Sequence, residues 1–116
     1  MALRRDAGEI LTVFRNPPKL AAFSMKDGAL LASADVCGDA DDLFFDSKRQ
    51  RVLVSCGEGF LDVLDAKESA YRHVTRIATV PGARTSLFVP ELDRLLLAVR
   101  AEAEQPASIW VFRPTP

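Results

Sequence analysis

The amino-acid sequence predicts an all-β fold built from stacked antiparallel sheets. Two observations predict it: short apolar segments recur between turn residues, and several of these segments have no polar face. Stretches with the apolar spacing of a helix are short and are interrupted by Pro or Gly. The chain has 116 residues, of which 48% are hydrophobic and 27% charged. This composition is typical of a globular domain with its own core.

Each apolar segment has the length of an ordinary strand, about five or six residues. Turn sequences such as Lys26-Asp27-Gly28 and Gly57-Glu58-Gly59 separate the segments. The sequence predicts strands at Ile10–Arg15, Lys19–Ser24, Ala29–Val36, Asp42–Asp46, Arg51–Ser55, Phe60–Asp65, Thr75–Val80, Thr85–Val89, Arg94–Val99 and Ser108–Arg113.

Several of these strands are apolar on both faces. The segments Leu43–Phe45, Val52–Val54 and Leu95–Val99 run without alternation, which is typical of strands buried on both sides. A two-layer sandwich leaves each sheet one wet face. Continuous apolar strands therefore favour several sheets stacked face to face.

An internal repeat gives the size of each sheet. A shift of 44 positions aligns Ala34 with Ala78, Val36 with Val80, Gly38 with Gly82, Leu43 with Leu87 and Phe44 with Phe88. A four-stranded unit of about 44 residues has the size of a propeller blade. The sequence therefore predicts a partial β-propeller of about two and a half to three blades.

The strands divide among these blades in chain order. We expect residues 1–9 to form an N-terminal tail and residues 10–36 to supply the second to fourth strands of a first blade. Residues 42–80 make a complete second blade, and residues 85–113 the first three strands of a third.

Three segments that span loops as well as strands carry a family resemblance. Gly38–Asp46, Arg51–Val63 and Pro81–Asp93 resemble the C-terminal blades of bacterial YVTN-type, lactonase-like β-propellers, and the resemblance extends over residues 10–113. It implies blades of a kind that elsewhere form seven-bladed rings. It also implies a function among ligand-binding modules, lactonases and other hydrolases, because propellers serve many functions.

Three incomplete blades do not surround a channel, because a propeller needs about four. They would also leave broad apolar blade faces exposed. We therefore expect the chain to be a fragment or to close a ring as a homo-oligomer. A homodimer, with about six blades, is favoured over a homotrimer, whose nine would exceed the usual range.

In a propeller the loops at one mouth of the channel carry function. In this chain the loops expected there are Asn16–Lys19, Cys37–Asp42, Gly57–Gly59, Pro81–Thr85 and Arg100–Pro106. A small-molecule ligand or a protein partner would bind among them.

Four acidic residues of these loops are candidate metal ligands. Asp39, Asp41 and Asp42 share one crossover loop, and Glu58 lies in a hairpin of the same blade. Carboxylates suit a divalent cation such as Ca²⁺, which could polarise a substrate and lower the pKa of water. Alternatively, Asp39 and Asp41 form the turn and Asp42 accepts hydrogen bonds from backbone amides.

The candidate catalytic residues are Asp42, Glu58 and Arg84. The Arg84 guanidinium could bind a carboxylate or a phosphate through two hydrogen bonds. Alternatively, Arg84 forms an ion pair with Asp42 or Glu58 across neighbouring blades. No cofactor other than the divalent cation is indicated.

Two cysteines and one histidine complete the residues with reactive side chains. The spacing of Cys37 and Cys56 matches neither a disulfide framework nor a zinc motif, so we expect buried, free thiols. His73 is expected in the connection between the third and fourth strands, far from the channel. Free thiols favour a cytoplasmic protein, although a periplasmic or secreted full-length parent stays open.

Charge and hydropathy exclude several function classes. The net charge of −1 provides no basic surface for nucleic acid. No apolar segment approaches the ~20 residues of a membrane span, and the first residues do not resemble a signal peptide. Two hypotheses stay open: a binding module, and a metal-assisted hydrolase of lactones or of phosphoesters, including phosphotriesters.

Overall fold

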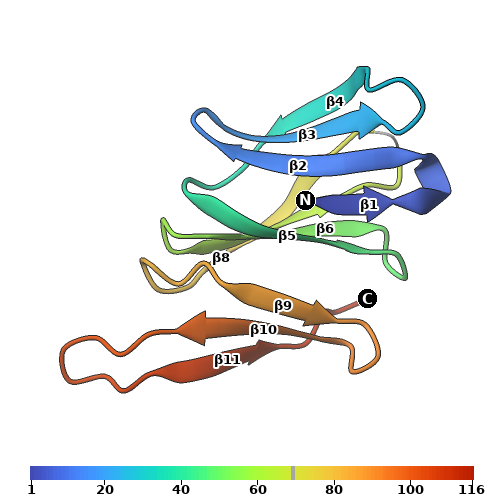
Figure 1. The fold of residues 1–116 in the computed structure, drawn as a ribbon. Coiled ribbons are helices and arrows are strands. Elements are labelled where there is room, and N and C mark those ends of the chain that lie inside the picture. The colour runs from blue at the N-terminus through green and yellow to red at the C-terminus, as the bar shows by residue number, and fades with distance from the viewer. Residues whose placement is uncertain (69) are drawn as a thin grey trace.

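The computed structural model describes residues 1–68 and 70–116 and has an all-β fold (Figure 1). In the described residues eleven strands form three antiparallel sheets in the orders β1-β2-β3-β4, β5-β6-β7-β8 and β9-β10-β11. The strands are β1 (Ala2–Arg4), β2 (Glu9–Arg15), β3 (Pro18–Ser24), β4 (Leu30–Asp35), β5 (Ala40–Asp46), β6 (Arg51–Cys56), β7 (Phe60–Asp65), β8 (Arg72–Ala78), β9 (Ser86–Val89), β10 (Arg94–Val99) and β11 (Ser108–Phe112). All ten predicted strands are present, with β8 beginning three residues before its predicted start.

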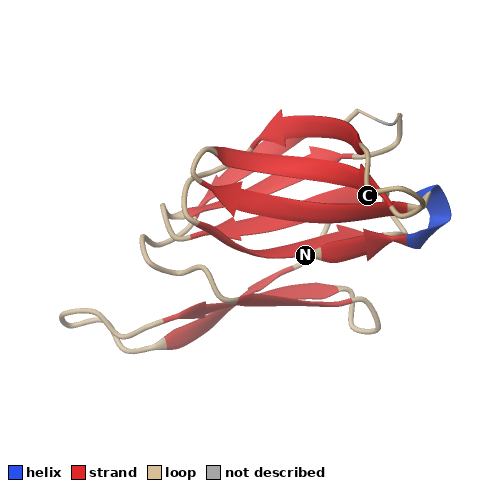
Figure 2. Ribbon diagram, turned by 45° about the horizontal axis from the view of Figure 1, so that its top comes forward, coloured by secondary structure: helices blue, strands red, loops and turns tan. Residues whose placement is uncertain are grey.

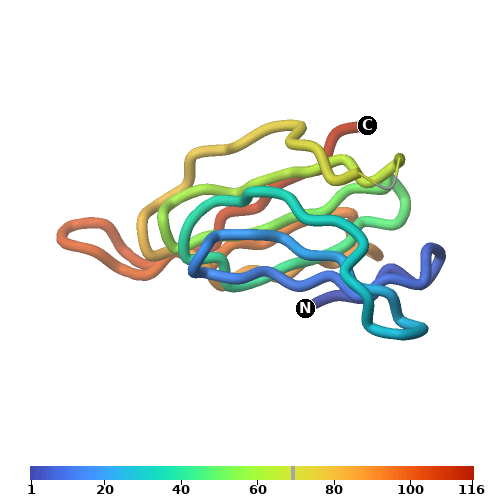
Figure 3. Tube along the Cα trace, turned by 90° about the horizontal axis from the view of Figure 1, so that it is seen from above, coloured from blue at the N-terminus to red at the C-terminus, as the bar shows by residue number. Residues whose placement is uncertain are grey.

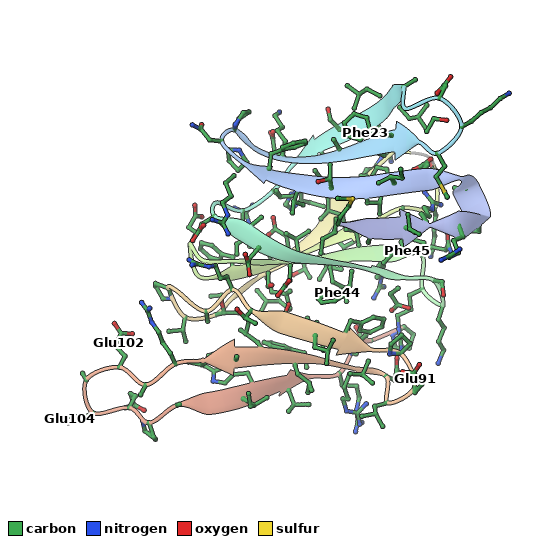
Figure 4. The ribbon with its side chains drawn as sticks, viewed as in Figure 1. Phe23, Phe44, Phe45, Glu91, Glu102 and Glu104 are labelled. Carbon is green, nitrogen blue, oxygen red and sulfur yellow. A yellow bond between two sulfur atoms is a disulfide. The ribbon has the colours of Figure 1, made fainter. Side chains whose placement is uncertain are left out.

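The three sheets lie face to face, as the apolar strands predicted (Figure 1). The middle sheet contributes to two separate hydrophobic cores. Consecutive side chains of β5 point in opposite directions, because strand side chains alternate between faces. Phe45 packs against the core shared with the first sheet, and Phe44 against the core shared with the third (Figure 4).

The first strand of each sheet lies on one side of the stack, next to the first strand of the neighbouring sheet. Seen from above, the strands of the three sheets overlie one another (Figure 3). The third sheet lies lowest in Figure 2, where the loop between β10 and β11 projects beyond the other two sheets. This is the arrangement of consecutive propeller blades, whose first strands line the channel.

The prediction that residues 1–9 form an N-terminal tail is wrong for residues 2–4. Residues 2–4 form β1, which pairs with β2 and completes a four-stranded first blade. A buried polar cluster attaches β1 to the second sheet: Arg4 Nη1 donates to the Tyr71 hydroxyl at 3.2 Å, and that hydroxyl donates to Glu9. Burial, followed by the hydrogen bond to Glu9, raises the pKa of Tyr71 to about 12. Burial of Arg4 and Glu9 is possible because each has a partner.

A buried carboxylate, Asp62, connects the strands of the middle blade to the first. Its side chain is 0% exposed and accepts hydrogen bonds from Arg76 at 2.7 and 2.9 Å and from the backbone N–H of Cys37 at 2.8 Å. His73 lies 3.7 Å from the same carboxylate and 2.7 Å from the carbonyl oxygen of Asp35. His73 was expected in a connecting loop, but it belongs to β8.

A second ion pair joins the middle and third sheets at the opposite end from the crossover loops. Arg49 donates two hydrogen bonds of 2.7 Å to the Asp93 carboxylate, and a third of 3.0 Å to Asp46. The paired geometry favours the ionised carboxylate. The hydrogen bond from Arg49 therefore lowers the pKa of Asp93 from its ordinary value.

No helix in residues 1–68 and 70–116 has the length and apolar character that crossing a membrane would require.

We predict that Asp62→Ala destabilises the fold by about 3 kcal/mol, because it leaves Arg76 and the Cys37 amide without their shared acceptor. Asp62→Asn keeps an acceptor but loses the charge, so its urea midpoint should lie between those of Asp62→Ala and the wild type. Urea unfolding followed by circular dichroism measures both. An Asp62→Ala midpoint equal to that of the wild type would contradict this role.

We predict that the Arg49–Asp93 pair makes stability depend on acid pH. Because the folded-state pKa of Asp93 is lowered, its contribution is complete above the unfolded pKa of about 3.9 and is lost as pH falls through the folded value. Asp93→Asn should therefore reduce the difference in urea midpoint between pH 7 and about pH 3. Arg49→Ala should reduce it in the same way, and an unchanged difference in either variant refutes the prediction.

Candidate functional site

Three of the loops predicted at the channel mouth meet at one end of the stack. The Gly57 amide donates to the carbonyl of Asp39 at 2.8 Å, and the Glu58 amide to the carbonyl of Gly38 at 3.1 Å. The Gly82 amide donates to the carbonyl of Gly57 at 2.7 Å. Backbone bonds thus hold both crossover loops against the hairpin between β6 and β7.

Glycine permits these close approaches. A Cβ atom on Gly57 would overlap the Asp39 carboxylate, and one on Gly38 would lie 2.5 Å from Oε2 of Glu58. Asp39 itself adopts a left-handed conformation, with φ of 58°, which aspartate tolerates better than most residues. The two carboxylates therefore lie over each other's loops.

Asp39 and Asp41 form ion pairs that cross the three blades. Arg15, at the end of β2, lies 3.3 Å from Asp39 and 2.8 Å from Asp41. Arg84, which precedes β9, reaches Asp39 from the other side at 2.9 Å. Arg84 therefore pairs with Asp39, whereas the sequence suggested Asp42 or Glu58 as its partner. These half-exposed pairs fix loop positions and contribute little to stability.

Asp42 accepts a hydrogen bond from a backbone amide, which the sequence left open as the alternative to a metal-binding role. Its Oδ2 atom accepts the amide hydrogen of Ser86 in the next blade at 2.8 Å. Beside it, the hydroxyl of Ser55 donates to the carbonyl of Arg84 at 2.7 Å. A comparable bond lies one blade earlier, where Arg15 Nε donates to the carbonyl of Ala40 at 3.1 Å. Residues 40 and 84 are related by the repeat, so the same carbonyl position accepts a bond from the preceding blade twice.

The predicted calcium ligands do not form a ligand set. Asp39 and Asp41 face arginines, Asp42 faces a backbone amide, and Glu58 lies over Gly38. Within residues 1–68 and 70–116, no three His, Cys, Asp or Glu side chains converge as a metal site requires.

The same end of the stack has an open hollow of about 510 Å³ beside the third blade. Its polar lining includes Arg84, Thr85, Arg100 and Ser108. Arg100 lies over Gly82, where a Cβ atom would approach its Nη2 atom to 3.0 Å. Among the described residues, Arg100 has no carboxylate within ion-pair distance, so its charge is open to a ligand. The sequence placed Arg100 in a mouth loop but gave no signal that it lies beside Arg84.

The cysteines correct a sequence-based expectation. Cys37 and Cys56 form a disulfide, with Cα atoms 5.9 Å apart, where free thiols were expected. Both side chains belong to the core between the first two blades. A separation of 19 residues carries no signal by itself. The bond forms because the first crossover loop lies against the end of β6.

Comparisons with known proteins support the fold. A solved chain from a mitotic checkpoint complex, itself a β-propeller protein, is similar with a TM-score of 0.78 at 13% sequence identity. The match covers 98% of this chain and 35% of that chain, so this chain spans about a third of its length. Neither a family model nor a curated protein matches the sequence. At this identity the similarity shows the fold alone: the chain has the fold of consecutive β-propeller blades.

We predict that the disulfide contributes about 3 kcal/mol to stability, as expected for a loop of this length. Reductant should lower the urea midpoint of the wild type and leave that of the double variant Cys37→Ser/Cys56→Ser unchanged. Mass spectrometry after alkylation in denaturant should find no modified cysteine unless reductant is added. Two alkylated cysteines in the non-reduced protein would contradict the bond.

Proposed function

We propose that this chain is a β-propeller binding module that closes its ring with a second copy of itself. It binds a ligand or a protein partner at the mouth formed by its crossover loops. The observation that carries the proposal is the apolar character of both outer faces of the stack, which have no sheet against them among the described residues.

The outer face of the third sheet is as apolar as a buried one. Leu96 pairs with Leu87 on one side and Val111 on the other, and Ala98 pairs with Ile109. Leu87, Ile109 and Val111 are 54%, 60% and 59% exposed. Contiguous exposed apolar surface of this kind marks an interface.

The outer face of the first sheet is apolar in the same way. A row of paired side chains crosses all four strands: Leu3 opposite Ile10, Ile10 opposite Phe23, and Phe23 opposite Leu30. Phe23 lies at the top of Figure 4, at the first sheet and away from the middle one. Exposed Phe14 extends the row along β2.

The two faces belong to opposite ends of the stack and differ in sequence. An interface between them is therefore head-to-tail, and head-to-tail contacts close a ring when the rotation fits. Within the chain, the first blade packs against the second and the second against the third in the same head-to-tail order. Two copies would give about six blades, a number within the usual range for propellers.

The polar groups at the mouth support a binding role. Arg84 and Arg100 line one hollow, and backbone bonds fix the loops beneath it. Such a site favours an anionic group. Metal-assisted hydrolysis has less support, because three of the four candidate carboxylates are occupied: Asp39 and Asp41 by arginines and Asp42 by a backbone amide. The Cys37–Cys56 disulfide favours a periplasmic or secreted location over a cytoplasmic one, since disulfides persist in oxidising compartments.

Light scattering after size exclusion tests the ring. The wild type should have twice the 12.7 kDa mass of one chain. Leu87→Glu places a charge on the outer face of the third sheet and should give a folded monomer, because an unpaired charge is costly to bury. Leu92→Glu is the matched control: Leu92 is similarly exposed but lies in a turn away from that face, and the variant should remain dimeric. A well-folded wild-type monomer would refute ring closure.

A further inference from the structure

We propose that the free edge of β11 and the groove beside it form a strand-addition site for an extended peptide of another polypeptide. The peptide that fits has apolar side chains at alternate positions and an acidic residue at its start. The site lies on the outer side of the third blade, opposite the channel, and does not depend on the ring-closing contact or on the mouth.

The third sheet lacks a fourth strand in the part of the chain that the structure describes. The first two sheets end with β4 and β8, whereas the order of the third ends at β11. An edge strand presents a row of unpaired N–H and C=O groups, which is a template for another strand. Figure 1 shows β11 as the lowest strand, with nothing beyond it.

Equivalent residues of the second and third blades show what the missing strand would cover. Asp62 in β7 and Trp110 in β11 hold the same position in the repeat. Asp62 is 0% exposed beneath Arg76 of β8, whereas Trp110 is 37% exposed. An added strand would cover Trp110 as β8 covers Asp62.

The groove beside this edge is mainly apolar. It has a volume of about 240 Å³ and lies between β8 and β11. Leu61, Val63 and Ile77 line it from the middle sheet, and Leu95 and Phe112 from the third. Side chains on one face of an added strand would enter it at every second position.

Charge at one end of the groove sets the direction and chemistry of the peptide. Arg51 and Arg113 line the end at which β11 finishes. The Asp46 carboxylate there is buried and bound by Arg49. Neither Arg51 nor Arg113 has a carboxylate within ion-pair distance among the described residues; Arg51 donates to the carbonyl of Thr115 at 2.6 Å. A strand antiparallel to β11 would begin at this end, so an acidic first residue would meet both guanidinium groups.

The probe is a synthetic peptide, Asp-Val-Thr-Val-Thr-Val-Thr, titrated into the full chain. Trp110 is the single tryptophan, so its emission should shift to the blue as the strand covers it. Amide exchange of β11 should slow on binding. The same peptide with two alternate N-methylated amides should bind about tenfold more weakly, because it loses bonds along the edge.

Variants of the chain locate the site. Thr75 lines the groove on β8, and Ala78 lies on the other face of the same strand. Thr75→Lys should weaken binding about tenfold by burying an unpaired charge, whereas Ala78→Lys should leave it unchanged. A peptide that begins with Lys in place of Asp should bind about fivefold more weakly to the wild type. Arg113→Ala should reduce that difference.

Three outcomes would overturn the proposal. The first is that neither emission nor amide exchange changes with peptide. The second is equal binding of the N-methylated peptide, which would mean that no strand pairs with the edge. The third is that the β11 amides are already protected without peptide, which would mean that a second copy covers the edge.

Discussion

A sheet that is apolar on both faces must be covered on both faces, and β5–β8 imposes this requirement on the molecule. Consecutive phenylalanines, Phe44 and Phe45, point to opposite sides of the sheet and into two different cores. Exposing either side would leave the apolar face of a whole sheet in water, and the free-energy cost is roughly 25 cal/mol for each Å² of apolar surface. The first and third sheets cover the middle sheet from either side. Their own outer faces are also apolar and therefore need a partner as well.

Polar contacts decide how the blades are positioned once the apolar faces have brought them together. Asp62 fixes the crossover into the second blade through the Cys37 amide, and Asp42 fixes the crossover into the third through the Ser86 amide. Arg49 and Asp93 join the second and third blades at the end opposite the crossover loops. The carboxylates of this chain therefore position loops. A propeller needs such contacts because hydrophobic packing alone is not directional.

The strand pattern could be predicted from the sequence because each strand is bounded by turn residues and is apolar along its length. β1 was missed, since its three residues carry no periodic pattern and pair only because β2 presents an edge. β8 was displaced because its exposed residues, from Arg72 to Arg76, resemble a polar connection. A strand's position depends in such cases on its neighbour and its hydrogen bonds, which a local pattern does not contain.

The sequence by itself determined the blade unit, its repeat of about 44 residues and which loops gather at one end of the stack. Only the tertiary structure decided which side chains meet there: Asp39 with Arg15 and Arg84, Arg100 beside Arg84, and Cys37 bonded to Cys56. The physical reason lies in the range of the interactions. Periodicity and turn chemistry act over a few residues, whereas ion pairs and disulfides join residues that stacking brings together from different blades.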